Sequence, residues 1–134
     1  MLSPRHLLGI ALLWLITMVA TPLLDDQVLV EQRATKLVIY NNTADTLNFT
    51  IMEVRKSRFT RWQPCDNPQL CGDRGIKPAM SGDLPYELIS GWYPGADVAV
   101  FWWHLTPDSA GPNGYRVDGP HKIVVPTPNR PFFE

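Results

Sequence analysis

The chain has 134 residues, a formal net charge of −1 and 45% hydrophobic residues. This length allows one domain with a real core and is too short for two. The near-neutral charge excludes a general electrostatic attraction to nucleic acid. Thirteen prolines and nine glycines indicate short strands joined by tight turns.

The most informative segment is an uncharged apolar run at residues 7–24, with Arg5 before it and Asp25 and Asp26 after it. A helix of this length reaches about 27 Å, near the hydrocarbon thickness of a bilayer. The basic residue before the run and the acidic residues after it predict a single-pass orientation with the N-terminus inside. The predicted membrane span is marked by Leu7, Trp14 and Leu24.

Cleavage of this segment as a signal peptide is the alternative. A signal peptide has a shorter apolar stretch, of about 7–15 residues, and a small-x-small cleavage site. The best cut here, after Ala20, would place Met18 where a small residue is needed. We therefore expect a signal-anchor helix at 1–24 and a stalk at 25–34. This predicts a protein of the inner (cytoplasmic) membrane with its C-terminal domain on the periplasmic, extracytoplasmic side.

Beyond residue 35, β-branched and alternating segments predict six or seven short strands. Residues 36–42 and 47–54 flank an Asn-Thr-Ala-Asp turn and are expected to form a hairpin. Residues 97–105, apolar on both faces, are typical of a central strand. The last strand is expected at 115–125, bulged at Gly119-Pro120. Further short strands are expected within 55–62, 76–80 and 84–89.

This number and spacing of strands predicts a mainly β fold, a small antiparallel β-sandwich of immunoglobulin-like type at 35–125. A small open barrel is the alternative. The Cys…Trp…Cys spacing of immunoglobulin domains is absent, so the prediction depends on strand count. Residues 126–134 form a Pro-rich tail without periodicity.

The two cysteines, Cys65 and Cys71, are expected to form a disulfide, because an exported domain matures in an oxidising compartment. Their spacing is not the C-x-x-C of thioredoxin-like redox sites. The bond should shape a Pro-rich loop and stabilise the fold by about 2–3 kcal/mol.

Aromatic residues are dense for a domain of this size. Trp102 and Trp103 point to opposite faces of their strand, so both can be internal only if that strand is covered twice. Aromatics that a small core cannot hide would mark a contact surface. The alternatives are that all of them are core and rim residues, or that some stack on sugars. The candidates for partner contact are Trp92, Tyr93, Trp102, Trp103, Phe132 and Phe133.

A second candidate surface is the basic run at 55–61. It can be a solvated turn and edge strand, where cations discourage edge-to-edge pairing. It can also attract anionic lipid head groups or an acidic partner, because a short stalk keeps the domain close to the bilayer. Its cations are Arg55, Lys56, Arg58 and Arg61.

No motif for catalysis is present: the chain lacks G-x-S-x-G, H-E-x-x-H and a Gly-rich phosphate loop. We therefore predict no catalytic, cofactor or metal site and no enzymatic activity. A blue-copper site needs two His, a Cys thiolate and a weak axial Met. The chain offers these types but not in the cupredoxin order, and a disulfide would consume the thiolate. The types are carried by Cys65, Cys71, Met80, His104 and His121.

The layout of an N-terminal span followed by a small exported domain is similar to that of single-span accessory subunits of bacterial membrane electron-transfer complexes, photosynthetic reaction centres included. The resemblance implies a helix packed among membrane subunits and a domain that caps the periplasmic side, with no catalytic residue. We expect a non-catalytic structural subunit that contacts the bilayer and other subunits. The alternatives are a cleaved, exported sandwich that binds glycan or peptide, and a copper or redox protein.

Overall fold

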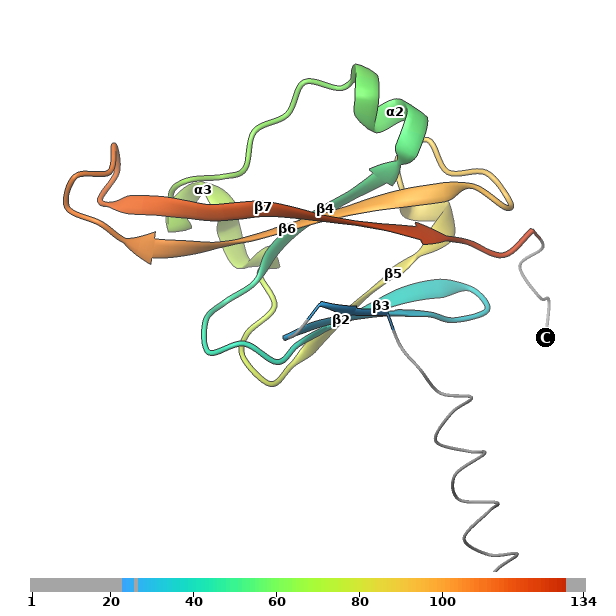
Figure 1. Ribbon diagram of the computed structural model, residues 1–134, viewed down its shortest axis with the longest axis horizontal. Helices are drawn as coiled ribbons and strands as arrows, with labels where there is room; N and C mark the ends of the chain where they lie inside the picture. Colours follow the sequence, from blue (N-terminus) through green and yellow to red (C-terminus); the bar gives the residue numbers. More distant parts are fainter. Residues whose placement is uncertain (1–22, 26, 130–134) are drawn as a thin grey trace, which may run out of the picture.

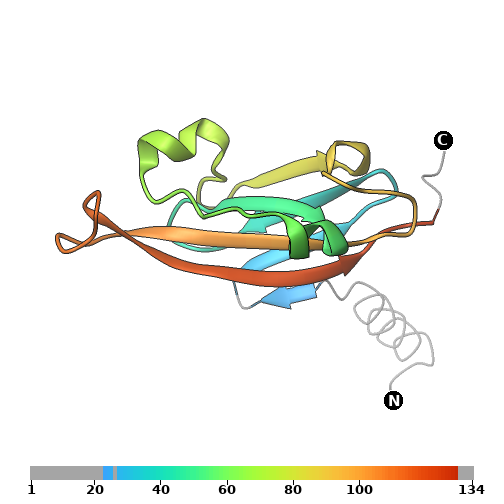
Figure 2. The same ribbon diagram turned by 90° about the horizontal axis from the view of Figure 1, so that it is seen from above.

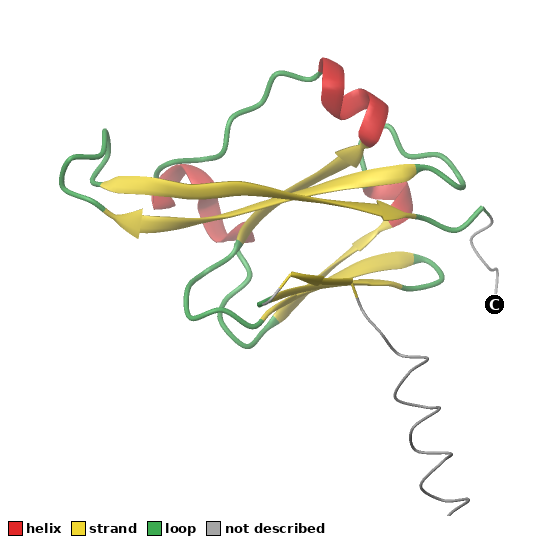
Figure 3. Ribbon diagram, in the orientation of Figure 1, coloured by secondary structure: helices red, strands yellow, loops and turns green. Residues whose placement is uncertain are grey.

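The computed structural model describes residues 23–25 and 27–129. They form a mainly β fold of two antiparallel sheets, as a small sandwich requires (Figures 1 and 3). The first sheet has the order β1-β2-β3-β5 and the second the order β4-β6-β7. The first contains β1 (Leu23–Asp25), β2 (Val28–Gln32), β3 (Lys36–Asn41) and β5 (Ser81–Pro85). The second contains β4 (Asn48–Glu53), β6 (Asp97–Pro107) and β7 (Tyr115–Pro126).

The first sheet begins earlier in the chain than expected. Most of the predicted span, with Leu7 and Trp14, lies outside the described residues, but Leu23 and Leu24 belong to β1. Residues 28–32, within the predicted stalk, form β2, which pairs with both β1 and β3. Val28 and Val30 are fully buried, so their alternation gives this segment a buried face and makes it a strand.

Side chains from both sheets meet in one core. Alternate residues of β3, Leu37 and Ile39, and of β6, Val98 and Val100, point into it and are buried. The ring of Tyr86 closes one end, and its hydroxyl donates to the carbonyl oxygen of Arg33 at 2.5 Å. This period of two in both layers is what buries one face of each sheet.

The predicted hairpin between 36–42 and 47–54 is wrong, because β3 and β4 belong to different sheets. The connection crosses between the layers and is held by the buried amide of Asn41. Its Nδ2 donates to the carbonyl oxygens of Asp45 and Ile76, both at 2.8 Å. Its Oδ1 accepts from the backbone N–H of Thr43 at 2.9 Å. A side chain that satisfies three backbone groups favours this crossing over a tight hairpin turn.

The prediction for the last two strands is confirmed, including the bulge. β6 and β7 pair antiparallel, and the register shifts where Trp102 faces His121 and His104 faces Asp118. Residues 119 and 120 therefore oppose the single residue 103, which defines a bulge. Gly119 has a φ of 124°, a backbone conformation that residues other than glycine rarely adopt. Figure 2 shows the β6–β7 hairpin extending beyond the first sheet.

Residues 54–71 cover the outer face of the second sheet. They contain the helix α2 (Val54–Phe59), an extended segment, and the helix α3 (Pro68–Cys71), which is followed by the short helix η1 (Gly72–Arg74). The ring of Trp62 lies 4.8 Å from that of Phe101 and 5.8 Å from that of Trp103. The expected strand within 55–62 is thus replaced by a helix and an aromatic cover.

Trp102 and Trp103 are consequently both internal, at 6% and 4% exposure. Trp102 belongs to the core between the sheets, and Trp103 lies under the cover, with its Nε1 donating to the carbonyl oxygen of Cys65 at 3.0 Å. The strand is covered twice, as its apolar pattern required.

Two further strand predictions are wrong in position: the strand expected at 76–80 does not form, and the strand expected at 84–89 is found earlier, at Ser81–Pro85. Within 76–80, Ile76 makes a single antiparallel bridge with Leu47 before the chain turns. Within 84–89, β5 ends at Pro85 and the short helix η2 (Tyr86–Leu88) follows.

Replacing Trp62 tests the second cover. Trp62→Ala should lower the free energy of unfolding by about 2–3 kcal/mol, because it exposes apolar surface of Phe101 and Trp103 and removes two aromatic contacts. Phe59→Ala, on the same excursion but at a side chain that is 87% exposed, should change it by less than about 0.5 kcal/mol. Urea unfolding followed by tryptophan fluorescence and far-UV circular dichroism measures both. If the two substitutions lowered the free energy of unfolding equally, residues 54–71 would not pack on the sheet as described.

Candidate docking surfaces

The predicted contact aromatics lie in different environments. Tyr93 is 42% exposed. Trp92 is half-buried: its ring stacks on Tyr86 at 5.7 Å, and its Nε1 donates to the hydroxyl of Thr127 at 2.9 Å. Trp102 and Trp103 are internal, so their side chains stabilise the two layers and leave little surface for a partner. Phe132 and Phe133 lie outside the described residues.

The basic run at 55–61 lies on α2 and the two residues that follow this helix. Arg55, Lys56 and Arg58 are helical and exposed, and Arg61 is exposed two residues beyond the helix. Arg55 is engaged, because its guanidinium hydrogen-bonds the hydroxyl of Tyr93 and lies 5.3 Å from that ring. Within the described part of the chain, the other three cations have no ion pair. Phe59, the last residue of the same helix, is largely exposed, so this basic surface includes an exposed aromatic residue.

A buried carboxylate begins this helix. Glu53 is 5% exposed, and its Oε2 accepts from the backbone N–H of Lys56 at 2.8 Å as an N-terminal cap. Its Oε1 lies 3.4 Å from Nε of Arg55. Burial raises the pKa of Glu53, but hydrogen bonds from the N–H groups of Arg55 and Lys56 and from the Arg55 guanidinium outweigh burial and hold this pKa below its ordinary value.

The lowered pKa of Glu53 gives a pH dependence with a definite sign. Its carboxylate stabilises the fold above the unfolded pKa of about 4.3, and this stabilisation is lost as the pH falls through the folded pKa. Glu53→Gln should therefore be less stable than the wild type at pH 7, with a smaller loss of stability between pH 5 and pH 3. Glu87→Gln, at an exposed carboxylate on η2, is the control and should leave stability at pH 7 nearly unchanged. If the wild type and Glu53→Gln lost the same amount of stability between pH 5 and pH 3, the lowered pKa of Glu53 would be contradicted.

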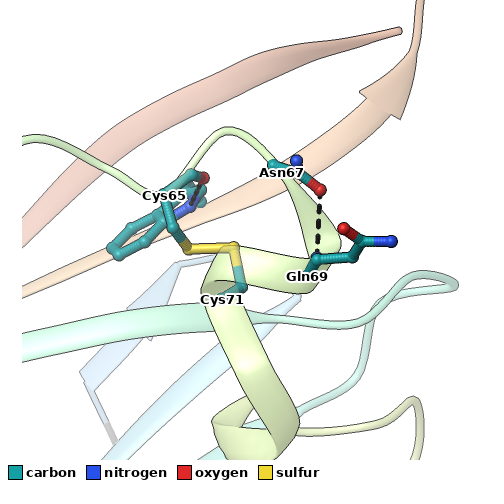
Figure 4. The surroundings of a disulfide bond; sticks show 5 residues. Cys65, Asn67, Gln69 and Cys71 are labelled. Atoms are coloured by element: carbon teal, nitrogen blue, oxygen red, sulfur yellow. Dashed lines mark hydrogen bonds between the residues drawn. A yellow bond between two sulfur atoms is a disulfide. The ribbon is translucent and has the colours of Figure 1, made fainter. Parts of the chain in front are cut away.

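The candidate copper ligands do not form a site. Cys65 and Cys71 are bonded to each other, as predicted (Figure 4). The side-chain Oδ1 of Asn67 accepts from the N–H of Gln69 and begins α3 within the closed loop (Figure 4). His104 lies against the carbonyl oxygen of Thr46, and His121 stacks on Trp102 at 4.1 Å. Among the described residues, no three His, Cys, Asp or Glu side chains gather as a metal site would require.

The edge of β4 that faces away from β6 is bonded only at its ends. Leu47, just before the strand, exchanges two hydrogen bonds with Ile76, at 2.9 and 2.8 Å, and Glu53 donates its N–H to Ser90 at 3.0 Å. In an antiparallel strand the backbone groups alternate between the two neighbours. The N–H and C=O groups of Phe49 and Ile51 therefore point to the same edge. The parallel bridge of Met52 with Ser90 also directs the N–H of Ser90 to the C=O of Ile51. No backbone partner from the described residues reaches the N–H of Ile51 or either group of Phe49.

An open groove of about 840 Å³ lies along this edge, between β4 and β5. β5 is itself the last strand of the first sheet, so the groove separates two free strand edges. The side chains of Met80 and Leu88 line it and are 57% and 68% exposed. The other apolar side chains along it are Phe49, Ile51, Ile76 and Leu84.

A smaller depression of about 260 Å³ adjoins the same edge and is lined by Thr50, Trp62 and Leu70, among others. Leu70 is 73% exposed. Arg74 lines both the groove and the depression, which places this cation at the edge of β4 between them. The edge is thus bordered by apolar surface on both sides.

The charge of the groove is positive. Its cations are Arg74 and Lys77, and its one carboxylate, Asp83, is bonded to Lys36 at 2.7 Å. That ion pair lowers the pKa of Asp83, first through the hydrogen bond from Lys36 and then through its charge. Within the described residues, Arg74 and Lys77 have no such partner.

No family model, curated protein or solved structure matches this chain. Of the helices in the described part of the chain, none combines the length and the apolar content of a membrane span.

Sequence reasoning missed the groove. The alternation of residues 47–51 predicts a strand but not which edge stays unpaired, and Met80 was considered only as a metal ligand. Arg74 and Leu88 carry no local signal, because the topology alone places them beside β4.

Proposed function

We propose that this chain is a non-catalytic, membrane-anchored accessory subunit whose extracytoplasmic β-sandwich docks onto other subunits of a membrane protein complex. The observation that carries the proposal is apolar surface left outside a completed core. Phe59, Leu70, Leu88 and Met80 are each more than half exposed, although both faces of β6 are already covered. Exposed apolar side chains beside a free strand edge are typical of an interaction surface.

The disulfide supports the extracytoplasmic placement, because structural disulfides persist in oxidising compartments. The strand order supports the immunoglobulin-like type. In such sandwiches strands A, B and E share one sheet and C, F and G the other. The strands β2-β3-β5 and β4-β6-β7 follow that arrangement, and the described residues between β4 and β5 contain no counterpart of strand D.

The direction of β1 supports an anchor at one end of the sandwich. Leu23 pairs with Val30 and Asp25 with Val28, so β1 begins toward the end where β2 finishes. The pairing of β3 with β5 and the bond from Glu53 to Ser90 put the start of α2 at that same end. Figure 2 shows α2 toward the end where β7 finishes. A bilayer facing this end would meet Arg58, Arg61 and Phe59, which fits anionic head groups as a further partner.

Native purification from membranes in mild detergent tests the proposal. The intact mass should include residues 1–20, and other membrane subunits should co-purify with the chain. A mature form that begins near Thr21 would replace the anchored subunit with the alternative, an exported binding domain. A chain that runs alone as a monomer, under conditions that keep neighbouring complexes intact, would contradict docking.

A further inference from the structure

We propose that the free edge of β4 binds an extended segment of a partner polypeptide, which adds one strand to the second sheet and carries acidic residues that face Arg74 and Lys77. This inference rests on the proposed docking function and assigns its surface and the chemistry of its partner. Addition of a strand to an exposed sheet edge is a recurring mode of peptide recognition, in which backbone bonds give affinity and alternate side chains give specificity.

The backbone of β4 offers a short, bounded ladder. Phe49 directs one free donor and one free acceptor to the edge and Ile51 directs a free donor, between residues that are already bonded to Ile76 and Ser90. Leu47 and Glu53 are six residues apart, or about 20 Å along a strand. The bonded ends restrict an added segment to roughly three to five paired residues, and they fix its position along β4.

The side chains beside this ladder favour an alternating segment. Successive residues of a strand point to opposite faces of the sheet, so an added strand would direct one set of side chains into the groove and the other toward the depression. In the groove the first set would meet Ile51, Leu84 and Leu88. In the depression the second set would meet Thr50 and Leu70. Apolar residues in the first set and small or mixed residues in the second match these surfaces.

Charge selects among the candidate occupants. A second copy paired through β4 would bring its own Arg74 and Lys77 to the same edge, which is unfavourable. The uncharged run 7–24 offers no acidic residue to these cations. The tail at 126–134 contains three prolines, and proline cannot donate to a ladder. An acidic, extended segment of another protein can hydrogen-bond the free backbone groups of β4 and pair its carboxylates with Arg74 and Lys77.

The test uses the full chain in mild detergent and a synthetic seven-residue peptide, capped at both ends, in which valine and threonine alternate between terminal glutamates. At a peptide concentration ten times its Kd, amide hydrogen exchange at Phe49 and Ile51 should slow about tenfold. Thr50, whose backbone groups face β6, is the internal control and should not change. A peptide with its central amides N-methylated should not bind, because it lacks the donors.

Charge exchange provides the second measurement. Arg74→Glu should weaken binding of the glutamate peptide about tenfold at low salt and strengthen binding of a peptide with terminal lysines. Arg116→Glu makes the same change at an exposed position on β7 that lines neither hollow. It should alter both affinities less than about twofold.

Three results would overturn the inference: no saturable binding by the wild type, binding without protection of Phe49 and Ile51, or concentration-dependent protection without peptide, which would identify a second copy as the occupant. The proposed function is judged separately, by co-purification. If Arg74→Glu chains, whose affinity for the peptide is lowered about tenfold, still retain all co-purifying subunits, docking uses another surface. The edge proposal then fails while the function stands.

Discussion

The apolar character of β6 on both faces is the constraint from which the rest of this structure follows. A strand that carries Val98, Val100 and Trp102 on one side and Ala99, Phe101 and Trp103 on the other cannot lie at a solvated surface. The first sheet covers one side. The other side is covered by residues 54–71, with Trp62 against Phe101 and Trp103. The disulfide and the bond from Trp103 to Cys65 fix the far part of this cover in place.

Using residues 54–71 as a cover has a consequence for the sheet edges. In a seven-stranded sandwich, the chain between β4 and β5 supplies a further strand. Here the same stretch crosses the outer face instead, so β5 keeps a free edge toward the groove, opposite the free edge of β4. The domain closes only the ends of the β4 edge, through Ile76 and Ser90. Pro85 shortens the edge of β5, because it has no N–H to offer. The middle of the β4 edge has no such protection, and apolar side chains remain exposed beside it.

Local patterns predicted those parts of the fold whose determinants are adjacent in sequence. β6 follows from its continuous apolar run of β-branched and aromatic residues, and β7 follows from the β-branched residues at its two ends. The bulge follows from Gly119-Pro120, and the disulfide follows from two cysteines in a domain that is expected to be exported. The hairpin between β3 and β4 failed, because the buried amide of Asn41 turns that connection between layers, and burial of an amide is not visible in sequence. The helix α2 was missed since 54–59 has no apolar periodicity; its start depends on a carboxylate, Glu53, that the preceding strand positions. The groove joins Phe49, Arg74 and Leu84 from three separate segments, so only the topology can reveal it.

The basic surface of α2 and the free edge of β4 are different regions of the domain, although one strand leads to both. β4 ends at Glu53, which caps α2. The free N–H of Ile51 lies two residues earlier on the same strand, and the free backbone groups of Phe49 lie four residues earlier. An end of the sandwich that rests on lipid would therefore leave the long side of β4 free for a partner. A strand added there would lie alongside β4. Its position relative to the membrane would therefore be set by β4, which also positions α2. A single rigid element would then determine both how the domain meets the bilayer and where its partner is held.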